Sequence, residues 1–262
     1  MSVDYDQEKW GVLNLRHLIL DSQGFIVFID NENDLDWITT AEYDEKGHEK
    51  PEKHKEILNG VALQECKPTT HLSETSLLSF KRLLGESLAR SLAHDYKKAA
   101  EILNHAESYL IDRGKELSRQ WYLARAGQTA ALILSVGIIL WTFRDISTNI
   151  FGAVFFNTCL CMVTGALGAL MSIIFRMGKE NLNCLSGKAL HEIESSYRVI
   201  AGALSALLVS MLVRAELFLP VFSRIDQKEI ALIALGFVAG MSERFAPSIL
   251  AKLEKSHKKK EE

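Results

Sequence analysis

The acidic run at residues 30–36 is the first part of the sequence whose residue types and spacing could do chemistry. Acidic side chains stand at every second position, at Asp30, Glu32, Asp34 and Asp36. Calcium-binding loops place oxygen ligands at positions 1, 3, 5 and 7, with glycine at position 6 and glutamate at position 12. In this chain Leu35 and Ala41 occupy those last two positions. We therefore interpret the run as a solvated acidic loop and not as a calcium site.

Histidine and cysteine, the other common metal ligands, are scattered. His48 and His54 lie six positions apart among Lys and Glu, which is poor spacing for metal ligands, so we interpret them as solvated. The cysteines form no disulfide framework and no CxxC motif. They are Cys66, Cys159, Cys161 and Cys184. Two of them fall inside an apolar run, where cysteine acts as a small hydrophobic residue. We predict no metal site and no cofactor.

Motifs of known catalytic types are missing from the sequence. It has no glycine-rich phosphate loop, no GxSxG and no HExxH, and nothing in its pattern brings two acidic residues together as an acid and a base. We predict no catalytic residue and a protein that is not an enzyme. Residues 1–60 hold 14 acidic and 6 basic side chains, so direct nucleic-acid binding is not expected.

Four apolar runs occupy the second half of the chain, at residues 126–143, 150–175, 199–213 and 230–241. The second run has 26 residues without a charge, which is enough for about 39 Å of helix at about 1.5 Å per residue. A bilayer core of about 30 Å needs about 20 apolar residues. We predict a mainly α fold with a four-helix transmembrane bundle in residues 126–250. The expected spans are about 126–143, 150–175, 199–218 and 229–246.

Charges beside these runs predict the orientation of the bundle. Basic residues precede the first run, lie between the second and third, and follow the fourth: Lys115, Arg119, Arg125, Arg176, Lys179, Lys188, Arg198, Lys252 and Lys255. The loop expected at Arg144–Asn149 carries one Arg and one Asp. Because positive loops stay in the cytoplasm, we predict that both termini are cytoplasmic and that residues 251–262 form a basic cytoplasmic tail. Met1–Trp10 is acidic and does not resemble a signal peptide.

Residues 1–70 are predicted to form a small cytoplasmic α+β domain that senses or binds a partner. Leu13–Leu20 and Phe25–Ile29 are short apolar segments separated by good turn chemistry, which predicts two strands. Residues 39–56 are polar and charged and are expected to form a loop. Residues 57–66 are expected to form a short helix or a strand.

Residues 71–125 are predicted to form a cytoplasmic helical hairpin or stalk. Apolar residues at three- and four-residue spacing predict an amphipathic helix from Ser73 to about Ala93. A second stripe predicts a helix over residues 99–124, and no proline separates it from the first apolar run. This stripe could bind a partner or a neighbouring protomer. We favour packing on the first helix as a hairpin.

Small residues at intervals of three or four mark three of the predicted spans. They are Gly165, Gly168, Ala169, Gly202, Ala206, Gly236 and Gly240. Such residues let helix backbones approach closely in lipid, so we predict a tightly packed bundle, either within the chain or between copies. Between the second and third spans, an apolar stripe from Leu182 to Tyr197 fits a helix on the inner leaflet or one packed on the N-terminal domain.

Polar residues near the ends of the last two spans are candidates for intramembrane roles. These are Glu216, Glu243 and Arg244. Ionisable groups at membrane depth usually face a bundle interior, a partner or water. For Glu243 and Arg244 we favour an ion pair that fixes helix rotation. A conduction path and headgroup exposure are the alternatives. Trp121, Tyr122 and Trp141 are candidate anchors at the headgroup level.

Three sequence blocks resemble a known group of proteins. They are Glu107–Arg113 with Arg119–Leu123, the GALGALMS block Gly165–Ser172, and the GFVAGMSERF block Gly236–Phe245. Residues 75–250 thereby resemble a loose group of bacterial multi-spanning membrane proteins with variable N-terminal domains. Membrane proteins built this way include effectors of anti-phage systems, some of them encoded beside retrons. The resemblance implies a bacterial inner-membrane location and an abortive-infection role.

The lead hypothesis is an inner-membrane effector. When released or triggered through its cytoplasmic part, it would oligomerise and permeabilise or depolarise the membrane. Its expected partners are the lipid bilayer, further copies of the chain, and a cytoplasmic protein or nucleoprotein at residues 1–125. The alternative is a non-enzymatic membrane anchor or scaffold that recruits a cytoplasmic partner. A small channel or transporter ranks third, because the spans do not form inverted repeats.

Overall fold

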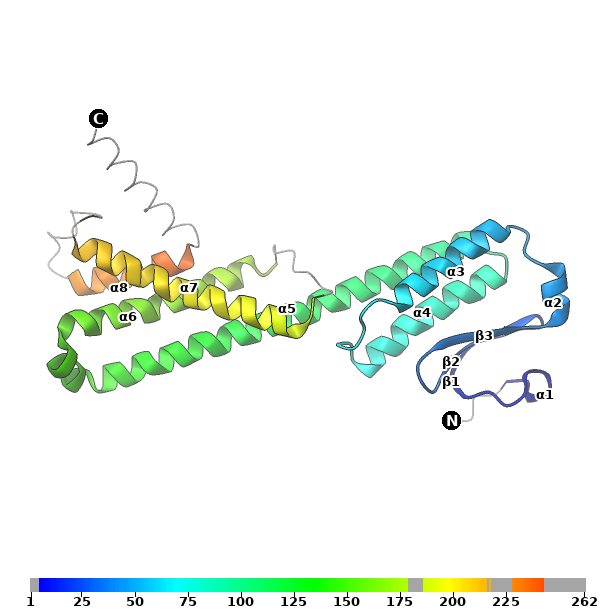
Figure 1. Ribbon diagram of the computed structural model, residues 1–262, viewed down its shortest axis with the longest axis horizontal. Helices are drawn as coiled ribbons and strands as arrows, with labels where there is room; N and C mark the ends of the chain where they lie inside the picture. Colours follow the sequence, from blue (N-terminus) through cyan, green and yellow to red (C-terminus); the bar gives the residue numbers. More distant parts are fainter. Residues whose placement is uncertain (1–4, 179–185, 216, 218–227, 243–262) are drawn as a thin grey trace, which may run out of the picture. The chain divides into compact units, whose positions relative to one another are not determined.

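The computed structural model is mainly helical and describes residues 5–178, 186–215, 217 and 228–242 (Figure 1). The chain divides into two units, and each is described by itself. The first unit covers Met1–Leu117, and the second covers most of the chain from Ser118 onward. Helix α5 begins in the first unit and ends in the second.

The first unit begins with a short helix and a three-stranded antiparallel sheet. Its elements are α1 (Gln7–Trp10), β1 (Leu15–Asp21), β2 (Phe25–Asp30) and β3 (Leu35–Thr39), and the strand order is β1-β2-β3. The prediction of two strands joined by a tight turn is confirmed, and β3 and α1 are additional. Ser22 makes the first turn, because its Oγ accepts a hydrogen bond from the Phe25 N–H at 3.0 Å and donates one to the Phe25 carbonyl at 2.6 Å.

Central strand β2 is buried on both faces of the sheet, which is why its sequence is continuously apolar. Ile26 and Phe28 pack against Trp10 of α1 on one face. Phe25, Val27 and Ile29 point to the other face, where they join the core formed with the helices. Successive side chains of a strand point to opposite faces, so one apolar run supplies both layers.

Four helices complete the first unit: α2 (Ala41–Lys46), α3 (Pro51–Glu65), α4 (Glu74–Leu92) and the first part of α5 (Tyr96–Thr142). The expectation of a loop over residues 39–56 is wrong, because α2 and the start of α3 lie there. Pro51 occupies the first turn of α3, where its missing N–H costs nothing. The amphipathic helix predicted from Ser73 is confirmed, and the Ser73 hydroxyl caps it by accepting the Ser76 N–H at 3.2 Å.

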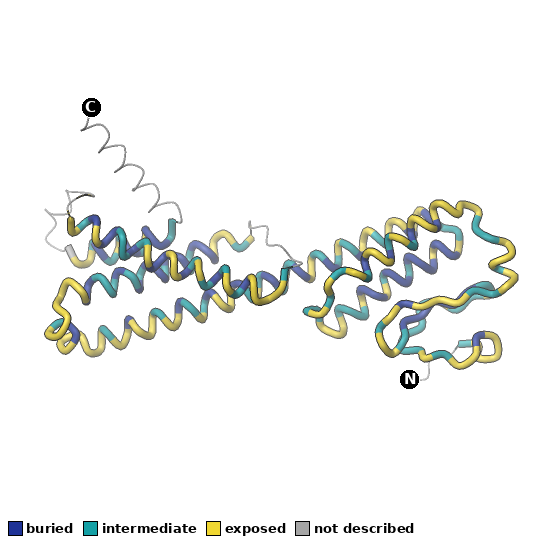
Figure 2. Tube along the Cα trace, viewed as in Figure 1, coloured by how far each residue is buried: buried dark blue, intermediate teal, exposed yellow. Residues whose placement is uncertain are grey.

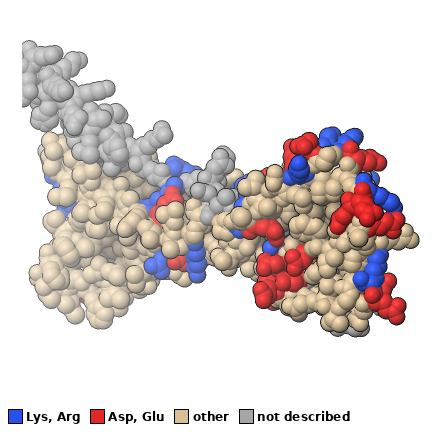
Figure 3. Space-filling view, turned by 45° about the vertical axis from the view of Figure 1, so that its right-hand side comes forward, with Lys and Arg blue, Asp and Glu red and all other residues tan. Residues whose placement is uncertain are grey.

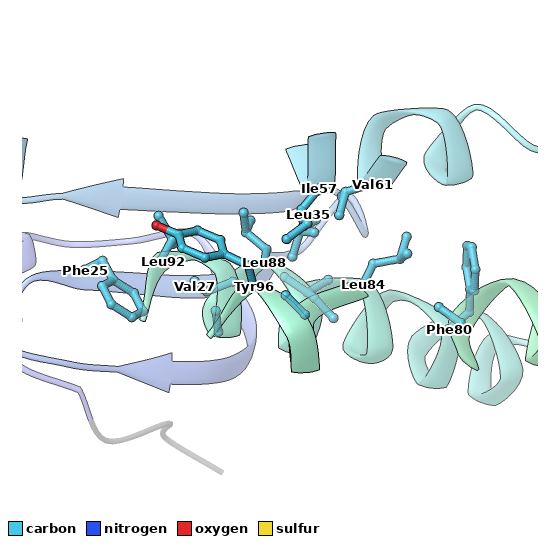
Figure 4. Packing of buried hydrophobic residues seen from close by; sticks show 14 of the residues in the cluster. Phe25, Val27, Leu35, Ile57, Val61, Phe80, Leu84, Leu88, Leu92 and Tyr96 are labelled. Atoms are coloured by element: carbon cyan, nitrogen blue, oxygen red, sulfur yellow. The ribbon is translucent and has the colours of Figure 1, made fainter. Parts of the chain in front are cut away.

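One hydrophobic core joins the sheet to these helices. Figure 4 shows Phe25, Val27 and Leu35 of the strands, Ile57 and Val61 of α3, Phe80, Leu84, Leu88 and Leu92 of α4, and Tyr96 of α5. Ala99, Ala106 and Leu110 of α5 belong to the same cluster. The apolar stripe of the second predicted helix therefore packs within the chain, as the hairpin interpretation expects. Each fully buried leucine contributes about 1.5–3 kcal/mol of transfer free energy.

The second unit is built from the remainder of α5, α6 (Arg144–Arg176), α7 (Lys188–Arg214) and α8 (Lys228–Met241). Within the described residues, α5, α6 and α7 are long and apolar enough to span a membrane. Helix α6 lies at the centre: 44% of its most apolar stretch is buried, against 17% for α5 and 33% for α7 (Figure 2). A stripe of α5 at Tyr122, Ala126 and Ala130 packs on Ala166 and Val199 of its neighbours.

The start and the path of α6 differ from the sequence prediction. The loop expected at Arg144–Asn149 is helical, since the Phe143 N–H bonds to Ile139 and the Ser147 N–H bonds to Phe143. The helical path of α6 is instead interrupted at Gly152, whose φ of 85° and ψ of 155° are open almost only to glycine.

The expected fourth span begins as α8, and its last residues, 243–246, lie outside the described part of the chain. The described part of α8 has 14 residues, or about 21 Å of helix. A fourth crossing and a cytoplasmic location of both termini therefore stay predictions.

The apolar stripe expected to form a separate helix before the third span is part of α7. Leu182 and Leu185 lie outside the described residues, while Ile193 and Tyr197 lie on α7, exposed. The face of α7 that packs inward instead carries His191, Ser195 and Val199. The helix therefore buries a partly polar face and presents its apolar stripe outward.

Candidate functional site

The small residues singled out in the sequence meet at one place, where α6, α7 and α8 cross. A Cβ atom added to Gly165 would lie 2.5 Å from the Ala206 Cβ and 2.7 Å from the Gly202 carbonyl oxygen. A Cβ on Gly202 would lie 2.5 Å from the Ala169 Cβ. Real Cβ atoms essentially never make such contacts. Only glycine therefore lets α6 and α7 approach this closely.

Helix α8 completes the same contact. A Cβ on Gly240 would overlap the carbonyl group of Gly165, and one on Gly168 would overlap the carbonyl oxygen of Phe237. A Cβ on Gly236 would lie 2.6 Å from the Cys161 carbonyl oxygen. All seven predicted packing positions thus lie at contacts within the chain. The backbones of α6, α7 and α8 therefore lie in direct contact at these glycines.

Polar side chains tie the three helices together where glycine brings them close. The Thr164 hydroxyl lies 2.9 Å from the Ile233 carbonyl oxygen of α8. The Cys161 thiol lies 3.5 Å from the Ala206 carbonyl oxygen and 3.3 Å from that of Leu232. Donors that find carbonyl acceptors at membrane depth avoid the cost of an unsatisfied polar group.

Asn157 and Glu229 form a further contact that sequence reasoning missed. The Asn157 amide of α6 donates to the Glu229 carboxylate of α8 at 2.8 Å. Asn157 is 8% exposed and lies one turn before Cys161 on the same helix. The sequence signal that could have revealed this contact is a polar amide side chain within an apolar run that has no charged residue.

The three aromatic residues predicted as headgroup anchors have different surroundings. Tyr122 is completely buried, with the Arg198 guanidinium 5.6 Å from its ring centroid, so its ring does not face outward as an anchor would. The Trp121 ring lies 6.4 Å from the ring of His191. Trp141 is 55% exposed at the end of α5, with Arg144 5.9 Å from its ring centroid. The outward exposure that anchoring needs is present at Trp141.

The predicted intramembrane residues Glu216, Glu243 and Arg244 lie outside the described residues. The ion pair predicted for Glu243 and Arg244 therefore stays a prediction. So do its alternatives, a conduction path and headgroup exposure. Arg214, at the end of α7, lies 3.3 Å from the Val154 carbonyl oxygen of α6.

The outer surface of the second unit is apolar over most of its described length. Exposed residues include Leu132, Ile138, Ile139, Phe151, Val154, Leu204 and Met211. An open hollow of about 310 Å³ between α5, α6 and α8 continues this surface, and its lining includes Leu134, Trp141, Val163 and Ile233. Figure 3 shows one face of the molecule, where acidic and basic side chains are spread over the first unit and the second unit is largely uncharged. Lipid or further copies of the chain would cover this surface.

A cluster of histidine and tyrosine side chains lies in the first unit, and sequence reasoning missed it. The rings of His48 and His54 stack with centroids 3.6 Å apart and an interplanar angle of 18°. The ring of His94 lies 5.4 Å from that of His48. Tyr43 and Tyr96 complete the cluster, with ring centroids 6.1 and 6.2 Å from His94. We call these five residues the histidine cluster.

Burial and mutual proximity disfavour positive charge on the histidine cluster. Burial lowers the pKa of His54 to about 4, and the nearby His48 and His94 contribute to the shift. Burial and His94 also lower the pKa of His48, against an opposing effect of Asp44. Two unit charges about 4 Å apart repel by about 4 kcal/mol at the effective dielectric constant of a protein surface. Both stacked rings are therefore neutral at neutral pH.

The interpretation of His48 and His54 as solvated is wrong for His54, which is only 8% exposed. His54, Ile57, Val61 and Gln64 are the buried residues of α3, at the spacing of one helix face. Reading α3 from Pro51 onward would have placed His54 on that face. No local sequence pattern predicts that His94, forty residues after His54, lies near these rings.

The acidic run 30–36 covers the end of β2, the turn that follows it and the first two residues of β3. Carboxylate oxygens of Asp30, Glu32 and Asp34 lie within 4.8 Å of one another. The Asp30 carboxylate accepts the N–H groups of Glu32 and Asp34 at 2.9 and 2.7 Å, which is the usual work of an aspartate at a turn. Burial and the carboxylates of Asp30 and Asp34 raise the pKa of Asp36. The geometry is that of an acidic hairpin turn.

No known protein family, curated protein or solved structure matches the chain.

Proposed function

We propose that the protein is a bacterial inner-membrane effector whose cytoplasmic part holds the membrane unit inactive. Release or triggering through residues 1–125 lets several copies associate and permeabilise or depolarise the membrane, in an abortive-infection response to phage. The single observation that carries the proposal is the contrast between a glycine-packed interior and a long apolar exterior on α5, α6 and α7.

This contrast favours an oligomer over a one-chain channel. The seven small residues are used within the chain, and the backbones of three helices are in contact there. Any opening for ions would therefore form between copies or at their boundary with lipid. The exposed side chains of α5, α6 and α7 offer the apolar surface for such contacts.

The experiment is to measure inner-membrane potential with a voltage-sensitive dye after induced expression. We compare the full chain with residues 118–262, which begin where the second unit begins. A truncation at residue 71 would cut the core shared by Phe25, Leu35 and Leu84, and exposed core would confuse the result. Depolarisation by residues 118–262 but not by the full chain supports restraint by the first unit. Depolarisation by both supports an effector whose restraint comes from a separate partner.

A matched pair of variants, made in residues 118–262, tests whether depolarisation needs the packed bundle. Gly240→Leu disrupts the contact of α8 with α6, whereas Gly127→Leu on α5 meets no atom within 4 Å at its Cβ. Depolarisation that depends on the packed bundle is lost in Gly240→Leu and kept in Gly127→Leu. If neither the full chain nor residues 118–262 depolarises cells while both insert, the effector proposal fails.

The second candidate is a membrane anchor that recruits a cytoplasmic partner. The observation that favours it is the separate core of the first unit, whose residues 1–60 hold 14 acidic and 6 basic side chains. Replacing residues 126–250 with unrelated membrane hairpins distinguishes the two functions. A scaffold keeps its cellular phenotype after this replacement, and an effector loses it.

A further inference from the structure

The histidine cluster joins segments that are far apart in the sequence. Tyr43 belongs to α2, His48 to the connection after it, and His54 to the first turn of α3. His94 comes from the turn between α4 and α5, and Tyr96 is the first residue of α5. Gly47, with a φ of 63°, and His94, with a φ of 62°, both turn the chain sharply beside the cluster. The cluster therefore fixes the α2–α3 segment to the α4–α5 turn.

Hydrogen bonds between the two segments hold this contact. The Tyr43 hydroxyl donates to the Leu92 carbonyl at 2.5 Å, and the Lys50 N–H donates to the Tyr96 hydroxyl at 3.4 Å. The His54 Nδ1 lies 2.8 Å from the Ser91 Oγ. Within the α4–α5 turn, the His94 Nδ1 lies 3.0 Å from the Tyr96 hydroxyl.

The titratable groups that face the rings come from each of these elements. They are Tyr43 and Asp44 of α2, His48 and His54, His94 of the turn, and Tyr96 of α5. Burial raises the pKa of Tyr43 to about 12, so its phenol stays neutral over the physiological pH range. Asp44 favours a charged His48, but the second and third imidazolium would face like charges. Protonation therefore converts a stack of neutral rings into mutual repulsion.

We propose that the histidine cluster is a proton-operated clamp, which holds the α2–α3 segment on the α4–α5 turn while its rings are neutral and releases the segment when they become charged. The depressed pKa values of His48 and His54 agree with this direction. The sheet and the leucines of α4 hold the rest of the unit, so release is local. The inference goes beyond the proposed function, since its readout is local opening and not membrane potential.

The experiment is hydrogen exchange, read by mass spectrometry, on the full chain in lipid nanodiscs at about pH 7.5 and about pH 5. Exchange is corrected for its intrinsic pH dependence. We expect the protection of peptides covering residues 43–56 to fall about tenfold or more at the lower pH, the change that one pKa unit produces. Peptides covering residues 80–90 of α4 should keep their protection. Equal protection of residues 43–56 at both pH values would overturn the proposal.

Variants test whether the cluster is the cause. His48→Gln with His54→Gln removes two protonation sites, and the amide of residue 54 can still bond to Ser91; this variant should lose most of the pH effect. His105→Gln, at an exposed position on α5, is the matched control and should retain it. A pH effect that persists in the double variant would contradict the clamp. His94→Asn is a milder variant, since Asn tolerates a positive φ, and it should weaken the pH effect.

A direct titration keeps the proposal testable if the double variant fails to fold. Selective isotope labelling of histidine in the wild-type chain gives the titration of each ring by NMR. The clamp requires His54 to titrate well below the ordinary histidine value of 6.5. Titration of His54 at or above that value would rule out a cluster that resists charge.

Discussion

At the scale of single residues, a substitution at Gly152 would measure the free-energy cost of an unusual backbone conformation. Its φ of 85° and ψ of 155° lie in a region that is essentially restricted to glycine, yet an added Cβ meets no atom within 4 Å. We expect Gly152→Ala to lower the free energy of unfolding by about 1–3 kcal/mol through strain alone. Gly127→Ala, also without a steric contact, should be neutral or stabilise α5 by up to about 1 kcal/mol. Unfolding in mixed micelles measures both, and equal values for the two variants would contradict this account.

His54 gives the first unit a pH-dependent stability. Its pKa is lowered to about 4 from an ordinary 6.5, so the unfolded chain binds a proton more readily than the folded one. Stability is therefore complete above pH 6.5 and is lost as the pH falls from about 6.5 toward about 4, by up to about 3 kcal/mol. Thermal unfolding of the full chain as a function of pH checks the sign. A loss of stability above pH 6.5 would contradict it.

At the scale of elements, the contact of α6 with α8 depends on the missing side chains of its glycines. Gly240→Ala places a methyl group onto the backbone of Gly165. We expect a loss of about 1–3 kcal/mol, typical of overpacking. Unfolding in mixed micelles measures it, with Gly127→Ala as the control. If Gly240→Ala is as stable as the wild type, the backbones of α6 and α8 are not in contact.

Elements with a strong local pattern could be predicted from the sequence, and those set by distant contacts could not. The spacing of Leu84, Leu88 and Leu92 predicted α4, and the absence of proline allowed α5 to continue into the apolar run. Residues 39–56 looked like a loop because charges outnumber apolar residues there, although Pro51 and His54 mark the start of α3.

The candidate site likewise has a part that could be predicted from the sequence and a part that could not. Small residues at regular spacing predicted where α6, α7 and α8 meet, because helices in lipid associate by close packing without a hydrophobic driving force. The sequence could not say whether they meet within a chain or between chains; the structure places them within it. The histidine cluster needs two segments far apart in the sequence to converge, and its residues have no periodic spacing. Burial of Tyr122 depends on α7, which lies far along the chain.

At the scale of the whole molecule, the effector proposal predicts contacts between the apolar exteriors of copies. We expect disulfide cross-linking in membranes for at least one of Leu132→Cys, Phe155→Cys and Met211→Cys, each in a Cys66→Ser background. These positions are exposed on α5, α6 and α7. Ala130→Cys, at a buried position on α5, is the control and should not cross-link. If none of the three exposed positions cross-links above the control, association through these faces is excluded.

The burial of Cys161 gives the chain a built-in chemical reporter. Its thiol is fully enclosed between the carbonyl oxygens of Ala206 and Leu232, whereas Cys66 is exposed on the first unit. A membrane-permeant alkylating reagent should therefore modify Cys66 quickly and Cys161 only when α6, α7 and α8 separate. The ratio of the two rates, read by mass spectrometry from the unmodified sequence, would time the opening of the helices in living cells.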